Sequence, residues 1–369
     1  MPEQNTMGEL PKLLKMMEKY NASDLHIKTG APPIYRITGS VHKSEMEPLT
    51  LEQVKQLIFS VMTKEQIKKL EEAGDIDFSL GLSGIGRFRI NVFKQRGTYS
   101  MAARRVNFNI PTFDELLLPP GIKKIPTMNE GLVIVTGITG SGKSTTLASI
   151  LSVINHTRRT HIITIEDPIE YLHRDDLSFV NQREVGGDVE SFNTALKYVV
   201  RQDPDIILVG EMRDVETFEF ALTASETGHL VLTTLHSSTV SQTIGRILDL
   251  FPPDRHNQIR QLLKFNLRAI ISQRLLKGAT KEYPRVPAVE LLLSTPPVRK
   301  AIEEGEDERL GELMSHNKDD GMQTYNQSLV SLVKRKLISR ETALKASPSP
   351  EALEMNLKGI YIGTDKAKS

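Results

Sequence analysis

The chain has 369 residues, of which 39% are hydrophobic and 25% charged, so length predicts two domains and composition excludes a disordered chain or a collagen-like rod. The 47 Lys and Arg residues against 46 Asp and Glu give a net charge of +1, which argues against a protein dominated by nonspecific nucleic-acid binding. Since there is no Cys, disulfides, thiolate zinc sites and a cysteine nucleophile are excluded.

The first hundred residues carry the pattern of a mixed α/β domain. Apolar residues recur at helical spacing over residues 7–20 and again around 50–72, which predicts a first helix in place of a secretion signal, and a second helical region. Strands are predicted at 25–27, at 34–37 and within 86–105. No apolar run approaches the roughly 20 residues that a membrane-spanning helix needs.

A stretch rich in Pro and turn residues follows Arg105 and predicts a domain boundary. We expect an amino-terminal domain over residues 1–106, a linker over 107–114 and a second domain over 115–369. From Gly131, short apolar strands alternate with helical patterns, which predicts a mostly parallel sheet with crossover helices. Helical patterns at 255–276, 297–304, 322–336 and 339–346 predict a helical carboxyl-terminal region from about residue 255.

A complete phosphate-binding loop connects the first of these strands to a helix. The segment from Gly137 to Ser144 reads Gly-Ile-Thr-Gly-Ser-Gly-Lys-Ser, in which glycines let backbone N–H groups face phosphates and the helix amino terminus adds its positive end. Lys143 is expected to reach the β and γ phosphates of ATP, and Ser144 to ligate Mg²⁺. The predicted nucleotide-binding residues are Gly137, Thr139, Gly140, Ser141, Gly142, Lys143, Ser144 and Thr145.

Carboxylates follow the next two strands. The segment Glu166-Asp167-Pro168-Ile169-Glu170 ends the strand that begins at His161, and Glu211 follows the strand that ends at Val209. In a parallel sheet such positions lie over the phosphates, where carboxylates can order Mg²⁺-bound waters and accept a proton from water. Gly210 stands where a Walker B Asp is usual, which leaves Glu211 as the acid. A solvated acidic turn, and a structural pair between Glu211 and a nearby Arg, are the alternatives.

Two histidines bracket the fourth strand, at positions 229 and 236. At about 3.3 Å per residue the strand separates them by roughly 23 Å, so both cannot contact one γ-phosphate. We expect His236, at the carboxyl end of the strand, to be the phosphate sensor or hydrogen-bond donor.

Arginines gather at the end of the first domain, at positions 87, 89, 96, 104 and 105. Phosphoryl transfer develops charge that a cation can neutralise from across a domain or subunit boundary. Arg89, Arg104 and Arg105 are therefore candidate arginine fingers, with a solvated strand face as the alternative.

Together these motifs resemble the secretion-type ATPases, specifically the retraction motors of type IV pili in the PilT/PilU group. The resemblance runs from Ala22–His26 through Gly86–Asn91, the phosphate-binding loop, the Asp box Ile163–Glu170, the Walker B segment and the His box Gly228–His236 to Ile271–Leu276. It implies a PAS-like domain, a RecA-like ATPase domain and an ATP-hydrolysing homohexamer with ATP between domains. It also implies Glu170 as catalytic base and Glu211 as Walker B acid.

The resemblance further implies a cytoplasmic, peripheral location at the inner membrane. Contact with the membrane would come only through a protein partner, the pilus platform protein, with a related retraction ATPase ring as a further partner and no nucleic acid.

One segment departs from that group. Principal retraction motors carry Ala-Ile-Arg-Asn-Leu-Ile-Arg-Glu, whereas residues 297–304 here read Pro-Val-Arg-Lys-Ala-Ile-Glu-Glu. The departure favours an accessory motor, and neutral drift on a helix is the alternative. The other functions considered are a pilus assembly or type II secretion ATPase, a nucleic-acid motor, which the low aromatic content disfavours, and a non-hydrolysing nucleotide-binding scaffold.

Overall fold

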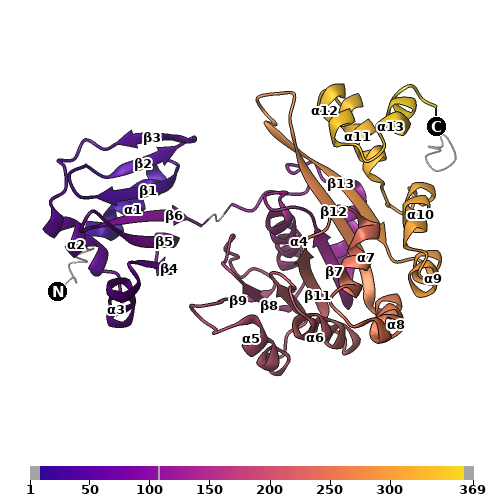
Figure 1. Cartoon of the computed structure of the whole chain (residues 1–369), viewed down its shortest axis with the longest axis horizontal. Coiled ribbons are helices and arrows are strands. Elements are labelled where there is room, and N and C mark those ends of the chain that lie inside the picture. Colours follow the sequence, from indigo (N-terminus) through magenta and orange to yellow (C-terminus); the bar gives the residue numbers. More distant parts are fainter. Residues whose placement is uncertain (1–8, 107–108, 361–369) are drawn as a thin grey trace. The chain divides into compact units, whose positions relative to one another are not determined.

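The computed structural model describes residues 9–106 and 109–360, and the chain divides into two compact units, residues 1–108 and 109–369 (Figure 1). The α/β class predicted from the sequence is confirmed. Residues 7–8 of the first predicted helix and residues 107–108 of the predicted linker lie outside the described residues.

The first unit is an antiparallel sheet with helices on one face. Its strands are ordered β3-β2-β1-β6-β5-β4. Buried side chains from the helices and from alternate strand positions form one apolar core, which includes Leu14, Leu57, Leu25 and Phe88. The elements are α1 (Glu9–Lys19), β1 (Ala22–Lys28), β2 (Ile34–Ile37), β3 (Ser40–Lys43), α2 (Leu51–Phe59), α3 (Lys64–Ala73), β4 (Asp75–Leu82), β5 (Gly86–Gln95) and β6 (Thr98–Arg105).

The second unit begins with a segment that packs on its own domain. The Ser149 hydroxyl donates to the carbonyl of Pro111 at 2.5 Å, so this end of the predicted linker is fastened to helix α4. The elements up to the last parallel strand are η1 (Pro120–Thr127), β7 (Gly131–Thr136), α4 (Lys143–Thr157), β8 (His161–Glu166), β9 (Phe179–Glu184), α5 (Phe192–Val199), η2 (Val200–Gln202), β10 (Ile206–Val209), α6 (Val215–Glu226), β11 (Leu230–Leu235), α7 (Val240–Leu248), η3 (Pro253–Arg255), α8 (His256–Asn266) and β12 (Leu267–Lys277).

The sheet of this unit is ordered β13-β12-β7-β11-β10-β8-β9, and every neighbouring pair is parallel except β12 with β13 (Arg285–Leu293). Strands β7, β10 and β11 are buried at every position. Such strands are covered on both faces, as expected where crossover helices flank a parallel sheet.

The prediction of a helix over residues 255–276 was wrong in its second half. Helix α8 ends at Asn266, and residues 267–277 form β12, which pairs with β7 on one side and β13 on the other. The apolar run is compatible with a helix or a strand. It forms a strand because its backbone hydrogen-bonds to partner strands on both sides.

The remaining helices include a small cluster packed against strand β13. Buried side chains of this cluster include Tyr325, Leu329 and Leu353. Arg274 of β12 lies 4.7 Å from the centroid of the Tyr325 ring and donates to the carbonyl of Ala346 at 3.1 Å. The helices are α9 (Pro296–Glu304), η4 (Asp307–Arg309), α10 (Leu310–His316), α11 (Tyr325–Lys334), α12 (Arg340–Ala346) and α13 (Pro350–Leu357).

Candidate active site

The site is built where four parallel strands end side by side. Thr136 of β7 pairs with Leu235 of β11, and Val209 of β10 pairs with Thr233 of β11 and with Ile165 of β8. The residues that follow these strands therefore emerge at one edge of the sheet. They are the phosphate-binding loop, the His box, the Walker B segment and the Asp box.

The phosphate-binding loop owes its path to two glycines that no other residue could replace without strain. Gly137 has φ of 151° and Gly142 has φ of 92°, both in the region that L side chains rarely adopt. A Cβ at Gly137 would lie 2.3 Å from the carbonyl oxygen of Gln273, and one at Gly142 would lie 2.7 Å from the Gln273 amide nitrogen. The loop thus lies directly on strand β12.

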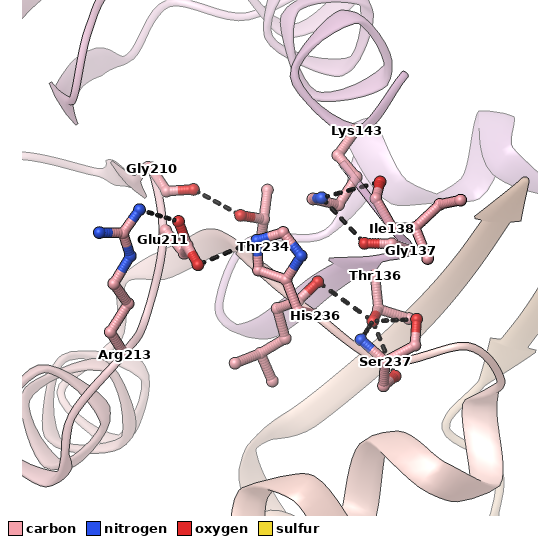
Figure 2. Close-up of polar contacts among 11 residues, drawn as sticks. Thr136, Gly137, Ile138, Lys143, Gly210, Glu211, Arg213, Thr234, His236 and Ser237 are labelled. Atoms are coloured by element: carbon pink, nitrogen blue, oxygen red, sulfur yellow. Dashed lines mark hydrogen bonds and ion pairs between the residues drawn. The ribbon is translucent and has the colours of Figure 1, made fainter. Parts of the chain in front are cut away.

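Lys143 folds back onto its own loop. Its Nζ donates to the carbonyl of Gly137 at 2.9 Å and to that of Ile138 at 3.3 Å, as Figure 2 shows. Burial lowers the pKa of the Lys143 ammonium, and the nearby Glu211 carboxylate opposes that shift. The ammonium is therefore held in the concave side of the loop by weak carbonyl acceptors, which an anion can displace.

The other predicted nucleotide ligands differ in their surroundings. Thr139, Gly140 and Ser144 are exposed, and the Thr145 hydroxyl lies 3.0 Å from that of Tyr171. Ser141 is buried, and its Oγ has no hydrogen-bond partner among residues 9–106 and 109–360. A buried hydroxyl without a partner is costly, and a phosphate bound in the loop would supply an acceptor.

The carboxylates of the Asp box differ in how far they are exposed to solvent. Glu166 accepts from the Thr164 hydroxyl at 2.7 Å and from the Gln182 amide at 3.1 Å, and also from the backbone N–H of Glu170. Burial raises the pKa of Glu166, against the effect of these hydrogen bonds. Glu170 itself is exposed. Glu166 therefore braces the turn, while the Glu170 side chain reaches solvent at the edge of the sheet.

Glu211 lies between an arginine and a histidine. Its Oε2 is 2.7 Å from the Arg213 guanidinium and its Oε1 is 3.0 Å from Nε2 of His236 (Figure 2). Burial favours the neutral acid, but the hydrogen bond from Arg213 and the charges of Arg213, His236 and Lys143 outweigh burial and lower the pKa of Glu211. The carboxylate is thus held ionised beside Lys143. The alternative of a pair with a nearby arginine describes part of this geometry.

Gly210 precedes Glu211 because there is little space at the end of β10. A Cβ at this position would lie 3.2 Å from the carbonyl oxygen of Ile165 and 3.4 Å from the Cα of Glu166. The close approach of the Asp box strand explains why a side chain is missing where Walker B strands usually carry Asp.

The two histidines lie at opposite ends of β11. His229 Nδ1 lies 2.9 Å from the carbonyl of Ala224, in the last turn of α6, and 3.1 Å from the hydroxyl of Thr227. His236 instead faces Glu211. The structure thus groups Lys143, Glu211 and His236 at one edge of the sheet, and His229 caps a helix at the other.

The candidate arginine fingers lie on both faces of the first unit's sheet. Arg89 and Arg104 are paired across β5 and β6, so they share the face opposite the helices, and both are exposed. Arg104 also donates to Asp24 at 2.8 Å. Arg105 is paired with the buried Phe88 and lies 3.7 Å from Glu18 of α1, on the helix-covered face.

Sequence reasoning missed two residues that the site uses. Arg213 pairs with Glu211. Its position two residues after the acid, beyond the end of a strand, could have predicted this pair. Gln273 contacts the phosphate-binding loop. It lies in the Ile271–Leu276 segment of the resemblance, but the predicted helix over 255–276 gave it no role at the loop.

Comparison with known proteins gives consistent matches over nearly the whole chain. The profile of the family described as "Type II/IV secretion system protein" matches residues 8–331. The type IV pilus retraction ATPase PilT of Pseudomonas aeruginosa is 42% identical over 93% of this chain and 99% of its own, and the type IV pilus ATPase PilU of the same organism is 41% identical over 95% and 91%. A crystal structure of the pilus retraction motor PilT with bound ADP matches at 47% identity and a TM-score of 0.86, covering 94% of this chain and 99% of that one.

None of the helices in the described part of the chain is long and apolar enough to cross a membrane.

Proposed function

The chain belongs to the type II/IV secretion system protein family and is a nucleotide-binding ATPase of its type IV pilus branch, and on that premise we propose that it is a homohexameric motor for pilus retraction. The proposal rests on the observation that Lys143, Glu211 and His236 lie together at one edge of the sheet. The similarity to a retraction ATPase over 93% of the chain supports the direction of the work.

In the proposed site the loop and Lys143 bind the phosphates of ATP. No cluster of three or more His, Asp or Glu side chains in the described residues could hold a metal ion alone, so Mg²⁺ would be held by the exposed Ser144 hydroxyl together with phosphate oxygens, water and carboxylate help. The ion, when bound, supplies charge neutralisation during phosphoryl transfer.

Each polar side chain at this edge then has a distinct task. Glu170 takes a proton from the attacking water, which its exposure at the carboxyl end of β8 allows. Glu211 stays ionised and orients water or Mg²⁺-bound water, and His236 donates a hydrogen bond toward the γ-phosphate. Arg89 and Arg104 are the better placed of the three arginine-finger candidates, since the described helices of the first unit pack on the other face of its sheet.

The motor step follows from the two-unit construction. We propose that hydrolysis changes the angle between the amino-terminal unit and the ATPase unit within the linker predicted at residues 107–114, ahead of Pro111, which is hydrogen-bonded to α4. A ring of six subunits would pass this movement to a platform protein of the inner membrane. Membrane contact would come through that protein alone, at the cytoplasmic face, and a related retraction ATPase ring is a further partner.

The test is surface piliation and twitching motility in a strain without this gene, scored alone and with loss of any related ATPase. Excess pili with lost motility are expected of a principal retraction motor. Loss of pili would overturn the proposal in favour of assembly. An unchanged strain whose purified protein binds ATP without hydrolysing it would favour the scaffold.

The accessory motor remains the second candidate, because of residues 297–304. They form most of α9, and Glu303, where the principal motors have Arg, lies 2.8 Å from Lys264 and accepts from Gln261 at 3.0 Å. Both partners lie on α8. Neighbouring side chains of α8 therefore stabilise the negative charge at position 303 in this chain. Retraction that weakens only under load in the deletion strain would indicate the accessory role.

A further inference from the structure

Gln273 is a buried amide at the floor of the phosphate-binding loop. It lies on β12, one residue after Ser272, and Ser272 pairs with Thr136 at the end of β7. The residue Gln273 is 3% exposed. None of the motifs used above includes it in the chemistry of ATP hydrolysis.

The Gln273 side chain joins the loop to the helix that follows. Its Nε2 donates to the carbonyl of Ser141 at 2.7 Å, and its Oε1 accepts from the Thr146 hydroxyl at 2.8 Å. Ser141 precedes the amino terminus of α4 and Thr146 lies in its first turn. Only a side chain with both a donor and an acceptor at its tip can make both bonds.

Close packing leaves the loop no alternative path at this point. The carbonyl oxygen of Gln273 would contact a Cβ at Gly137 and its amide nitrogen would contact one at Gly142. The backbone and side chain of one residue thus support both ends of the loop. Since both polar groups of the amide and both of their partners are removed from water, loss of either bond leaves a buried group without a partner.

We propose that Gln273 is a positioning residue that holds the phosphate-binding loop in its nucleotide-binding conformation before nucleotide arrives. The proposal rests on the ATPase function and extends it to a residue of β12. Without the amide, nucleotide binding would have to order residues 141–146, so affinity falls while the chemical step on bound nucleotide is largely retained.

The experiment compares Gln273→Met and Gln273→Glu with matched substitutions at Gln323, using the full-length chain. Gln323 is a suitable control because its amide also donates to a backbone carbonyl, that of Val289 at 2.9 Å, in contact with β13 instead of the loop. Binding of ADP and of Mg-ATP is measured by titration, alongside steady-state kinetics and thermal unfolding.

Gln273→Met loses both hydrogen bonds of the amide, whereas Thr146→Val loses one. One buried hydrogen bond corresponds to an effect of about threefold, and the pair to about tenfold. We expect the Gln273 variants to raise the KM for ATP and the Kd for ADP by about tenfold, with kcat reduced less than about threefold. The Gln323 variants should change neither constant. Thr146→Val, which removes the hydroxyl that Gln273 accepts from, should raise the Kd for ADP by a smaller factor and keeps the test valid if the Gln273 variants fail to fold.

Equal ADP affinity in all variants, or an equal loss of kcat and affinity at positions 273 and 323, would overturn the proposal. Failure of the proposed motor function looks different, because the deletion strain would then keep normal piliation and twitching motility, and the ADP affinities of the purified variants would still report on Gln273.

Discussion

The two sheets of this chain carry their functional side chains in different places. In the ATPase unit β7, β10 and β11 are buried along their whole length, so charged side chains are found only where these strands end. In the first unit the helices cover one side of the sheet, and Asp24, Arg104 and Arg89 lie in a row across three neighbouring strands, β1, β6 and β5.

The difference shows that a sheet covered on both faces can present chemistry only at its edge. There, the side chains of successive loops converge on a common point, which suits the binding of one compact phosphate group. A sheet with one open face instead presents side chains as a flat array, at spacings that the strand register fixes. We expect substitutions at the edge to affect nucleotide chemistry, and substitutions on the open face to affect turnover or the stability of the first unit.

The largest effect is expected at the edge, for Lys143→Ala. Removal of the ammonium takes away the side-chain cation that the loop carbonyls hold in place, so the Kd for Mg-ATP should rise about a hundredfold or more. Titration calorimetry measures the affinity, with Lys197→Ala, on α5 and paired with Glu216, as the control. Unchanged affinity for Mg-ATP in the Lys143 variant would contradict the expectation that side chains at this edge bind the nucleotide.

Glu211→Gln should keep nucleotide affinity and lose turnover. The neutral amide cannot balance the Arg213 charge or accept from His236 as the carboxylate does. We expect kcat to fall by about 100-fold or more, with the Kd for ADP changed less than about threefold. Single-turnover hydrolysis separates the chemical step from product release. Unchanged hydrolysis would remove Glu211 from the mechanism.

The arginines test the open face directly. Arg89→Ala and Arg104→Ala should each lower kcat by about tenfold or more, as expected of a cation that stabilises the transferred phosphoryl group. Arg105→Ala should have a smaller effect, since its guanidinium faces Glu18 on the covered side. ATPase rates are compared at equal oligomer content, established by native mass measurement. A larger loss for Arg105 than for Arg89 would contradict the assignment of faces.

The smallest expected effect is on stability, for Asp24→Asn. Burial raises the pKa of Asp24, but hydrogen bonds from Ser23 and Arg104 and the charge of Arg104 lower it below 3.8 overall. A lowered pKa in the folded state means that ionised Asp24 stabilises the fold at pH above about 4 and that this contribution is lost as the pH falls through the folded pKa.

The free energy of unfolding of the Asn variant should be about 1 kcal/mol lower than that of the wild type at neutral pH. This difference should shrink in acid. Calorimetry of the full chain at pH 7 and pH 3.5 measures both. Asp77→Asn is the control, because Asp77 lies on the same face but is exposed and accepts a hydrogen bond from the neutral Asn91 amide at 3.2 Å. A difference that grows in acid would contradict the pairing.

The sequence predicted the edge of the ATPase sheet well, because the motif residues are tied to strand ends and a parallel sheet brings strand ends together. Strands β7, β8, β10 and β11 and helix α4 lie where their apolar patterns predicted. The prediction was wrong for β12, whose apolar run fits a helix equally well until its two partner strands are known.

The missed Gln273 follows from that error, since a residue in a helix after α8 has no reason to contact residue 141. The arginines give a second lesson. Arg104 and Arg105 are neighbours in the sequence and were treated as one group, yet the alternation of a strand sends them to opposite faces. Since strand is predicted within residues 86–105, period-two alternation is enough to separate them.

The order of strands in the ATPase sheet has a consequence for synthesis on the ribosome. Strand β7 emerges first among the strands of its unit, but its neighbours β11 and β12 follow on the order of a hundred residues later. Until then the apolar strand that carries the phosphate-binding loop has no lateral partner, and the nascent chain must be protected from aggregation over that interval. The nucleotide site therefore matures late in translation, when β12 closes beside β7 and delivers Gln273 to the loop.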